Sequence, residues 1–171
     1  MIESPRLLLR RLRPSDERDL IALDSDPHVM KYVGSPAGPR SPEETAVRVR
    51  QRIHDDQGPL GFWLVESRID GGFHGLGALI RMPSGDDIEW AYRLARHSWG
   101  QGIATEAAGA LLDHAFGAVA LPKVVAVTYP ENRASQRVRE KLGFAHHGFI
   151  DYRGVKAAYY VITREAWGGS A

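Results

Sequence analysis

Two glycines one residue apart, Gly100 and Gly102, have the spacing that most clearly indicates chemistry in this chain. They lie between an apolar segment that predicts a strand and an alanine-rich run, residues 104–116, that predicts a helix. Glycine lets the backbone adopt positive φ and lets a ligand approach the main chain closely. The free N–H groups and the dipole at the start of a helix attract anions. The turn is therefore predicted to hold a pyrophosphate.

Two common phosphate-binding loops do not fit this turn. Thr105 stands where a dinucleotide fingerprint has its third glycine, and no Gly-Lys-Ser or Gly-Lys-Thr follows, as a P-loop requires. An isolated glycine pair is often a simple turn, so the interpretation also depends on the rest of the chain. We interpret the turn as a loop for coenzyme A.

The GNAT acetyltransferases have a coenzyme A signature, Gln/Arg-x-x-Gly-x-Gly/Ala, which residues 99–107 (WGQGIATEA) resemble. Gly102 and Ala104 match its last two defined positions, whereas Trp99 replaces the Gln or Arg. With tryptophan at that position, the segment is similar to the Rim-type branch, the ribosomal-protein N-acetyltransferases.

Other segments resemble the same branch, and together they span nearly the whole chain. They are residues 4–16 (Arg-Leu-x-Leu-Arg and a later Asp), residues 26–30 (DPHVM), and residues 132–144 (Asn-x-x-Ser followed by KLGF). The resemblance implies an α/β protein with the GNAT fold, a mixed central β-sheet with a splayed strand pair and helices on both faces. It also implies acetyl-CoA as co-substrate and an amine acceptor.

The resemblance places the donor site on a strand end, the glycine turn and a later helix start. In GNAT enzymes the strand before the turn separates from its neighbour, and the pantetheine arm lies against its backbone. The implied cofactor-binding residues are Tyr92, Arg93, Leu94, Trp99, Gly100, Gln101, Gly102, Ile103, Ala104, Thr105, Asn132 and Ser135. Glu106 falls in the first helical turn, where we expect it to interact with the helix dipole rather than to act in catalysis.

Acetyl transfer to an amine requires a neutral nitrogen, and Glu89 is the candidate catalytic base. It occupies the acidic position of a strand element of the Rim-type branch, and strand alternation places it on one face with Ala91 and Arg93. A base must lie in a cleft and have a raised pKa. The alternative for Glu89 is a strand carboxylate satisfied by an arginine or by solvent.

Ser135 is the candidate for protonating the departing thiolate, by analogy with the Asn-x-x-Ser element. Its alternative role is a simple position in the first turn of a helix that Asn132 caps, and Asn132 can also contact the cofactor. Tyr129 and Tyr152 are alternative phenolic donors, although such residues are more often packed aromatics. Three further aromatics are interpreted as core residues rather than as an acceptor pocket: Tyr32, Trp63 and Trp90.

Composition narrows the class of protein. The 171 residues suit a single domain, residues 1–171, and the 43% hydrophobic and 25% charged content is typical of a globular protein. We find no membrane-length apolar run and no secretory signal, so a cytoplasmic protein with no membrane partner is expected. A net charge of +1 disfavours a nucleic-acid partner, and the arginines between positions 6 and 18 are interpreted as a solvated strand edge.

Residue usage also limits the chemistry. The chain has no cysteine, which excludes an acyl-cysteine intermediate and favours direct transfer from donor to acceptor. The seven histidines form no set with ligand spacing, so no metal is predicted. The oligomeric state stays open between monomer and homodimer.

Patterning predicts alternating strands and helices without a domain boundary. Strands are predicted at residues 6–12, 62–66, 75–81, 88–94, 124–128, 145–150 and 158–163. Helices are predicted at residues 17–23, 42–55, 104–116 and 133–142. Ser41 is the expected cap of the second helix, with Glu44 closing a capping box. Asp70-Gly71-Gly72 predicts a hairpin turn, and residues 34–40 predict a loop over the substrate cleft.

The sequence therefore predicts an acetyl-CoA-dependent N-acetyltransferase that acts on a primary amine, with a protein N-terminal α-amine as one acceptor. Two alternatives remain: an acetyltransferase of small-molecule amines, and a non-catalytic protein that binds acyl-CoA.

Overall fold

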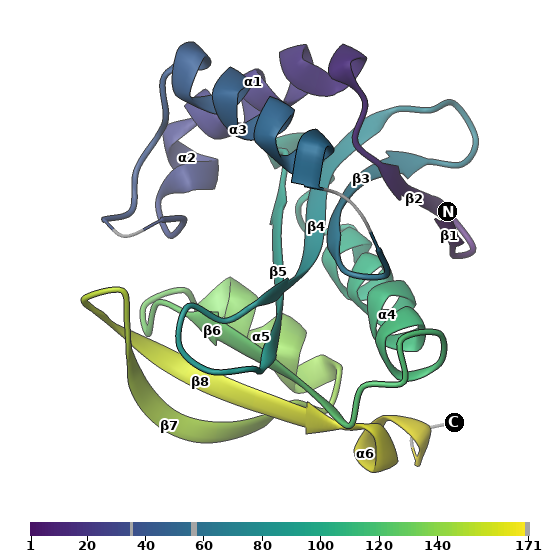
Figure 1. Ribbon diagram of the computed structural model, residues 1–171, viewed down its shortest axis with the longest axis vertical. Helices are drawn as coiled ribbons and strands as arrows, with labels where there is room; N and C mark the ends of the chain where they lie inside the picture. The colour runs from purple at the N-terminus through teal and green to yellow at the C-terminus, as the bar shows by residue number, and fades with distance from the viewer. Residues whose placement is uncertain (35, 56–57, 170–171) are drawn as a thin grey trace.

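The computed structural model describes residues 1–34, 36–55 and 58–169. Their strands form one eight-stranded sheet (Figure 1). The strand order is β1-β2-β3-β4-β5-β6-β8-β7. The strands are β1 (Ile2–Glu3), β2 (Leu7–Arg11), β3 (Gly61–Ser67), β4 (Phe73–Arg81), β5 (Ile88–Leu94), β6 (Lys123–Thr128), β7 (Ala145–Tyr152) and β8 (Val155–Thr163). Neighbouring strands are antiparallel except for β5 and β6, which are parallel, so the sheet is mixed as predicted.

Helices cover both faces of the sheet (Figure 1). They are α1 (Glu17–Ser25), α2 (Pro27–Met30), α3 (Pro42–Asp55), α4 (Ile103–Phe116), α5 (Arg133–Lys141) and α6 (Arg164–Gly168), with 3₁₀ turns η1 (Pro14–Asp16) and η2 (Arg96–Ser98). No helix of the described residues is long and apolar enough to cross a membrane.

Strand alternation divides the core between the two faces. On β3, Trp63 and Val65 pack in the cluster that includes Leu111 of α4, whereas Leu64 packs in the cluster that includes Leu20 of α1. This division follows from the two-residue period of a strand. Trp63 and Trp90 are almost fully buried, so the interpretation of these two aromatics as core residues is confirmed.

Local signals in the sequence set the ends of several elements. Ser41 and Glu44 form the predicted capping box: the Ser41 hydroxyl accepts from the Glu44 N–H at 3.1 Å, and the Glu44 carboxylate accepts from the Ser41 N–H at 2.9 Å. Gly143 follows α5 with a φ of +82°, a conformation that favours glycine. The predicted strands and helices therefore occur within a few residues of their expected bounds. The short elements β1, α2 and α6 were not predicted, because they have too few residues for a periodic pattern.

The interpretation of the arginines near the start as a solvated strand edge was wrong for Arg10, whereas Arg6, Arg13 and Arg18 are exposed. β2 lies between β1 and β3. Arg10 forms ion pairs with Asp16 at 2.8 Å and Glu66 at 2.9 Å, and its side chain is 11% exposed. Two carboxylates from other segments reach β2, and the sequence alone does not reveal them.

The sheet opens between β5 and β6. β5 pairs with β4 along its whole length, from Ile88 to Leu94, and β6 pairs with β8 along its whole length. Between β5 and β6, however, the register records one pair, Glu89 with Val125. The strands separate beyond that pair, so the predicted splayed strand pair is confirmed.

Candidate active site

A cleft of about 750 Å³ begins where β5 and β6 separate. Its lining comes from β5, the turn before α4, one side of α5, the segment after α2, and parts of β6, β7 and β8. The cleft brings together most of the sequence-predicted site residues: Glu89, Tyr92, Arg93, Leu94, Trp99, Gly100, Gly102, Ile103, Ala104, Thr105, Asn132 and Ser135. Gln101 is not part of the lining; its side-chain amide donates to the carbonyl of His97.

The glycine turn presents unpaired main-chain donors at one end of the cleft. Gly100 and Gly102 have φ values of +74° and +77°, and Gly102 is the N-cap of α4. Within the described part of the chain, the N–H groups of residues 100–105 have no acceptor. Trp99 fixes the turn to the end of β5, because its indole N–H donates to the Leu94 carbonyl at 2.9 Å. This arrangement fits an anionic group at a helix start.

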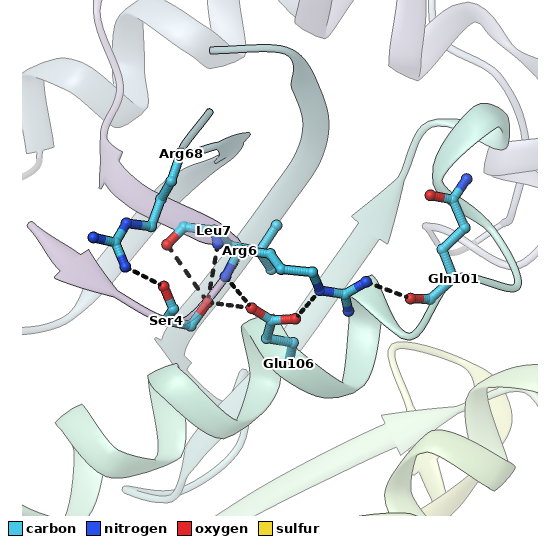
Figure 2. Close-up of polar contacts among 6 residues, drawn as sticks. All are labelled: Ser4, Arg6, Leu7, Arg68, Gln101 and Glu106. Carbon is cyan, nitrogen blue, oxygen red and sulfur yellow. Dashed lines mark hydrogen bonds and ion pairs between the residues drawn. The ribbon is translucent and has the colours of Figure 1, made fainter. Parts of the chain in front are cut away.

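An interaction network joins the start of the chain to the first turn of α4 (Figure 2). One carboxylate oxygen of Glu106 accepts from the Ser4 hydroxyl at 2.7 Å and from the Arg6 N–H at 2.8 Å, and the other accepts from Arg6 Nε at 2.6 Å. Arg6 also donates to the Gln101 carbonyl at 3.1 Å. Burial raises the pKa of Glu106, but these hydrogen bonds outweigh it, so the net pKa is lowered. Glu106 therefore holds the helix start in place in addition to facing its dipole.

Glu89 lies in the cleft at the point where the strands separate. It is 4% exposed, and its carboxylate accepts from the Tyr152 hydroxyl of β7 at 2.7 Å. Burial raises the pKa of Glu89, and the Tyr152 hydrogen bond and the charges of Arg139 and Arg153 lower it by less. Of the two alternative phenolic donors, Tyr152 is thus a partner of Glu89. A buried carboxylate with a raised pKa has the properties of a general base.

Ser135 lies in the first turn of α5 and is 7% exposed. Its N–H donates to the Asn132 side chain at 3.2 Å, so Asn132 caps the helix as expected. The Ser135 hydroxyl accepts from the Tyr92 hydroxyl at 3.3 Å and from the Arg139 guanidinium. Sequence reasoning missed Arg139, although its position four residues after Ser135 on a helix was a signal that the two side chains share a face.

The segment after α2 lines the cleft next to Tyr129. The Tyr129 hydroxyl donates to the Gly34 carbonyl at 3.0 Å, and the rings of Tyr32 and Tyr129 have centroids 6.0 Å apart. Tyr32 lines the cleft, unlike the two buried tryptophans. Ser35 of the predicted loop lies outside the described residues.

The Arg93 side chain anchors the helical layer above β5. Its guanidinium donates to the buried Asp24 of α1 at 2.6 and 3.1 Å, and Arg40 donates to the same carboxylate at 3.0 Å. Because the Arg93 guanidinium is held by Asp24, only the main chain of Arg93 is suited to the pantetheine contact that the resemblance implies.

The described residues contain no group of three or more His, Asp or Glu that could hold a metal ion. The polar groups described above instead present a row of main-chain donors, a buried carboxylate and a hydroxyl along one cleft.

Comparisons with known proteins agree with this fold. A family model described as an acetyltransferase (GNAT) domain matches residues 6–145. The chain is 34% identical over 141 residues to the uncharacterized protein YkkB of Bacillus subtilis, and the matched region covers 81% of each chain. The crystal structure of a GNAT-family acetyltransferase from Bacillus anthracis covers 96% of this chain and 98% of its own, with a TM-score of 0.84 and 26% identity.

A structure of RimL, a ribosomal L7/L12 alpha-N-protein acetyltransferase, has a TM-score of 0.78 and 22% identity and covers 95% of each chain. At that identity the likeness shows the fold alone. The family match covers most of the chain, and the open strand pair and glycine turn agree with it. The chain belongs to the GNAT family of acetyltransferases.

Proposed function

We propose that this protein transfers an acetyl group from acetyl-CoA directly to a primary amine, and that a protein N-terminal α-amine is the acceptor. The observation that carries the proposal is the position of Glu89, a buried carboxylate in a cleft whose other end is formed by the glycine turn, where main-chain N–H groups have no acceptor among the described residues. GNAT enzymes use acetyl-CoA as co-substrate, which fits an anion-binding turn.

In the proposed complex the pyrophosphate of acetyl-CoA accepts from the N–H groups of residues 100–105. The positive φ of Gly102 and the absence of a side chain there let the anion approach the backbone. The pantetheine arm lies along the free edge of β5 near residues 92–94, where β6 has separated from it. This leads the thioester toward Glu89 and Ser135, which line the same cleft.

Glu89 acts as the general base in this proposal. Removing a proton from an α-amine at pH 7 costs about 1 kcal/mol, against about 4.6 kcal/mol for a lysine amine. A single carboxylate with a raised pKa suits the smaller cost, and this difference favours an N-terminal amine over a lysine side chain. Ser135 donates a hydrogen bond to the departing sulfur.

The Rim-type branch is part of the same proposal. The segments at residues 4–16, 26–30 and 99–107 support it. The acceptor side of the cleft, with Tyr32, Tyr129 and Lys31, offers aromatic and polar groups to a peptide end.

The test is incubation with isotopically labelled acetyl-CoA and three acceptor sets: peptides with free N-termini, the same peptides N-terminally blocked but containing lysine, and small primary amines. Mass spectrometry is expected to find the label on free N-termini at a rate well above that on blocked peptides. Label on small amines alone would show that the acceptor is a small-molecule amine and not a protein N-terminus. Binding of acetyl-CoA without any labelled product across a range of pH would identify a non-catalytic acyl-CoA binder.

A further inference from the structure

Arg139 is a buried charged residue that the proposed transfer does not yet use. It is 2% exposed, lines the cleft, and extends from α5 toward the sheet. Its guanidinium lies over the rings of Trp90 and Tyr160, 5.2 and 5.8 Å from their centroids. Burial of an arginine costs several kcal/mol of desolvation free energy unless charge pairing and hydrogen bonds offset it.

The hydrogen bonds of Arg139 converge on Ser135. One terminal nitrogen donates to the Ser135 hydroxyl and, at 2.9 Å, to the Ser135 carbonyl. The other donates to the Val127 carbonyl at 2.8 Å, while Nε has no hydrogen-bond partner in the described part of the chain. The charge is thus fixed directly behind the hydroxyl that lines the cleft.

Hydrogen-bond accounting limits the direction of the Ser135 proton. A serine hydroxyl has two acceptor lone pairs and one hydrogen to donate. Arginine can only donate, so Arg139 fills one lone pair and the Ser135 hydrogen points away from it. The Tyr92 hydroxyl lies 3.3 Å away on the cleft side and fills the second lone pair when it donates. The hydrogen of Ser135 then remains for a group in the cleft.

We propose that Arg139 is a positioning residue for the acetyl transfer: through Ser135 it places a fixed positive charge and an oriented O–H donor at the sulfur of coenzyme A, so that the sulfur leaves as a stabilised thiolate. This inference rests on the proposed function. In the transfer step the amine nitrogen bonds to the acetyl carbon and its proton passes to Glu89. The carbon–sulfur bond breaks, and the sulfur keeps the electron pair while Ser135 keeps its proton and donates a hydrogen bond.

The groups that face the guanidinium are consistent with this role. They are Tyr92 and Glu89 of β5 and Tyr160 of β8. Glu89 is the one ordinarily anionic group among them, and it takes up the proton of the amine during the step. The positive charge of Arg139 is then left to face the sulfur, because an arginine does not lose its proton in a protein.

The decisive measurement is the ionisation of the coenzyme A thiol when it is bound. We would follow the thiolate by difference absorbance against bound desthio-coenzyme A, which has the same adenine but no sulfur. In the wild type the bound thiol is expected to ionise at a lower pH than the free thiol. In Arg139→Met its ionisation should move to higher pH, whereas Arg133→Met, which removes a charge from the same helix outside the cleft lining, should leave it unchanged.

A double-mutant cycle tests whether Arg139 acts through Ser135. Arg139→Met and Ser135→Ala should each lower kcat by about 10²-fold, the usual effect of losing one hydrogen-bond donor to a developing negative charge. The double variant should lose little more than either single variant, because residues that act as a unit are not additive. Fully additive losses would overturn the inference.

Arg139→Lys and Tyr92→Phe keep the test decisive should Arg139→Met fail to fold. Lysine retains the charge and should restore part of kcat. Loss of the Tyr92 hydroxyl should raise the pH at which the bound thiol ionises, but by less than loss of Arg139 does. An unchanged thiol ionisation in every variant overturns this inference alone, whereas a wild-type protein that does not bind coenzyme A overturns the proposed function.

Discussion

The glycine turn and the reacting centre share one cleft but are built in different ways. The turn uses main-chain groups from six consecutive residues, 100–105. The centre uses side chains from three separate elements, listed in chain order as Glu89 and Tyr92 of β5, Ser135 and Arg139 of α5, and Tyr152 of β7. Recognition of the donor therefore depends on local backbone shape, whereas the chemistry depends on long-range packing.

The difference explains which changes each region tolerates. A turn that binds through N–H groups is insensitive to many side-chain changes but not to a group that blocks the backbone. The centre, in contrast, depends on individual carboxylate, hydroxyl and guanidinium groups whose properties come from burial. Four substitutions test this contrast, and they are ordered below by the size of the expected effect.

Gly102→Glu should remove measurable acetyl-CoA binding, because the new side chain occupies the anion position and adds a like charge. An L residue in this conformation also costs about 1–2 kcal/mol. Calorimetry of the folded variant checks the result. Gly85→Glu is the matched control, because Gly85 has a φ of +92° and open space around it and lies outside the cleft lining. Equal acetyl-CoA affinity in Gly102→Glu and Gly85→Glu would show that the turn is not part of the donor site.

Glu89→Gln should lower kcat by about 10²-fold at neutral pH and leave acetyl-CoA affinity within about twofold. The base works in its ionised form, so the wild-type rate should rise with pH through the raised pKa of Glu89. In the variant, that acid limb should disappear and the rate should rise at higher pH, where more of the amine is neutral. A pH profile of unchanged shape and height would exclude Glu89 as the base.

Tyr152→Phe should move the acid limb of the rate profile to higher pH. The Tyr152 hydroxyl donates to the ionised carboxylate and so lowers the pKa of Glu89, and its removal raises that pKa. Rates below neutral pH should fall several-fold while the plateau at high pH is kept. Tyr159→Phe removes a similar hydrogen bond, to Asp87 outside the cleft lining, and should leave the profile in place. A limb that does not move, or that moves to lower pH, would contradict the proposed pairing.

Glu106→Ala tests whether the interaction network of Figure 2, called the clamp below, supports the turn. Loss of the charged hydrogen bonds should cost about 1–2 kcal/mol of unfolding free energy and lower Tm by about 3–8 °C. The acetyl-CoA Kd should rise by about threefold to tenfold, or about 0.7–1.4 kcal/mol, as the helix start loosens. Glu17→Ala breaks the exposed pair with Arg50 at a helix start away from the cleft and serves as the control. A variant that loses stability but keeps its affinity would separate the clamp from binding.

Much of the fold was predictable because its signals are local. The capping box at Ser41, the glycine after α5 and the alternation along β3 each depend on residues within a few positions of one another. The face of Glu89 was predicted by the same alternation. Arg10 shows the opposite case: its partner Glu66 lies 56 residues away, and the pattern around Arg10 suggested solvent.

The candidate site was predictable in part. The residues of the turn follow from the spacing of two glycines, and Asn132 and Ser135 follow from a short motif. Arg139 was missed, and Tyr152 was named only as an alternative phenolic donor and not as the partner of Glu89, because a sequence pattern does not show which side chains meet in the buried site. The distance of 63 residues between Glu89 and Tyr152 is closed by the pairing of β7 with β8 and of β8 with β6.

The sequence by itself determined where the backbone turns, where helices begin and end, and which side of a strand each residue faces, because short-range sterics and hydrogen bonds decide these features. Only the tertiary structure decided that Glu89 is buried with a raised pKa and that Arg139 stands behind Ser135. Desolvation and charge interactions depend on all neighbours in space, and these neighbours come from strands and helices that are distant along the chain.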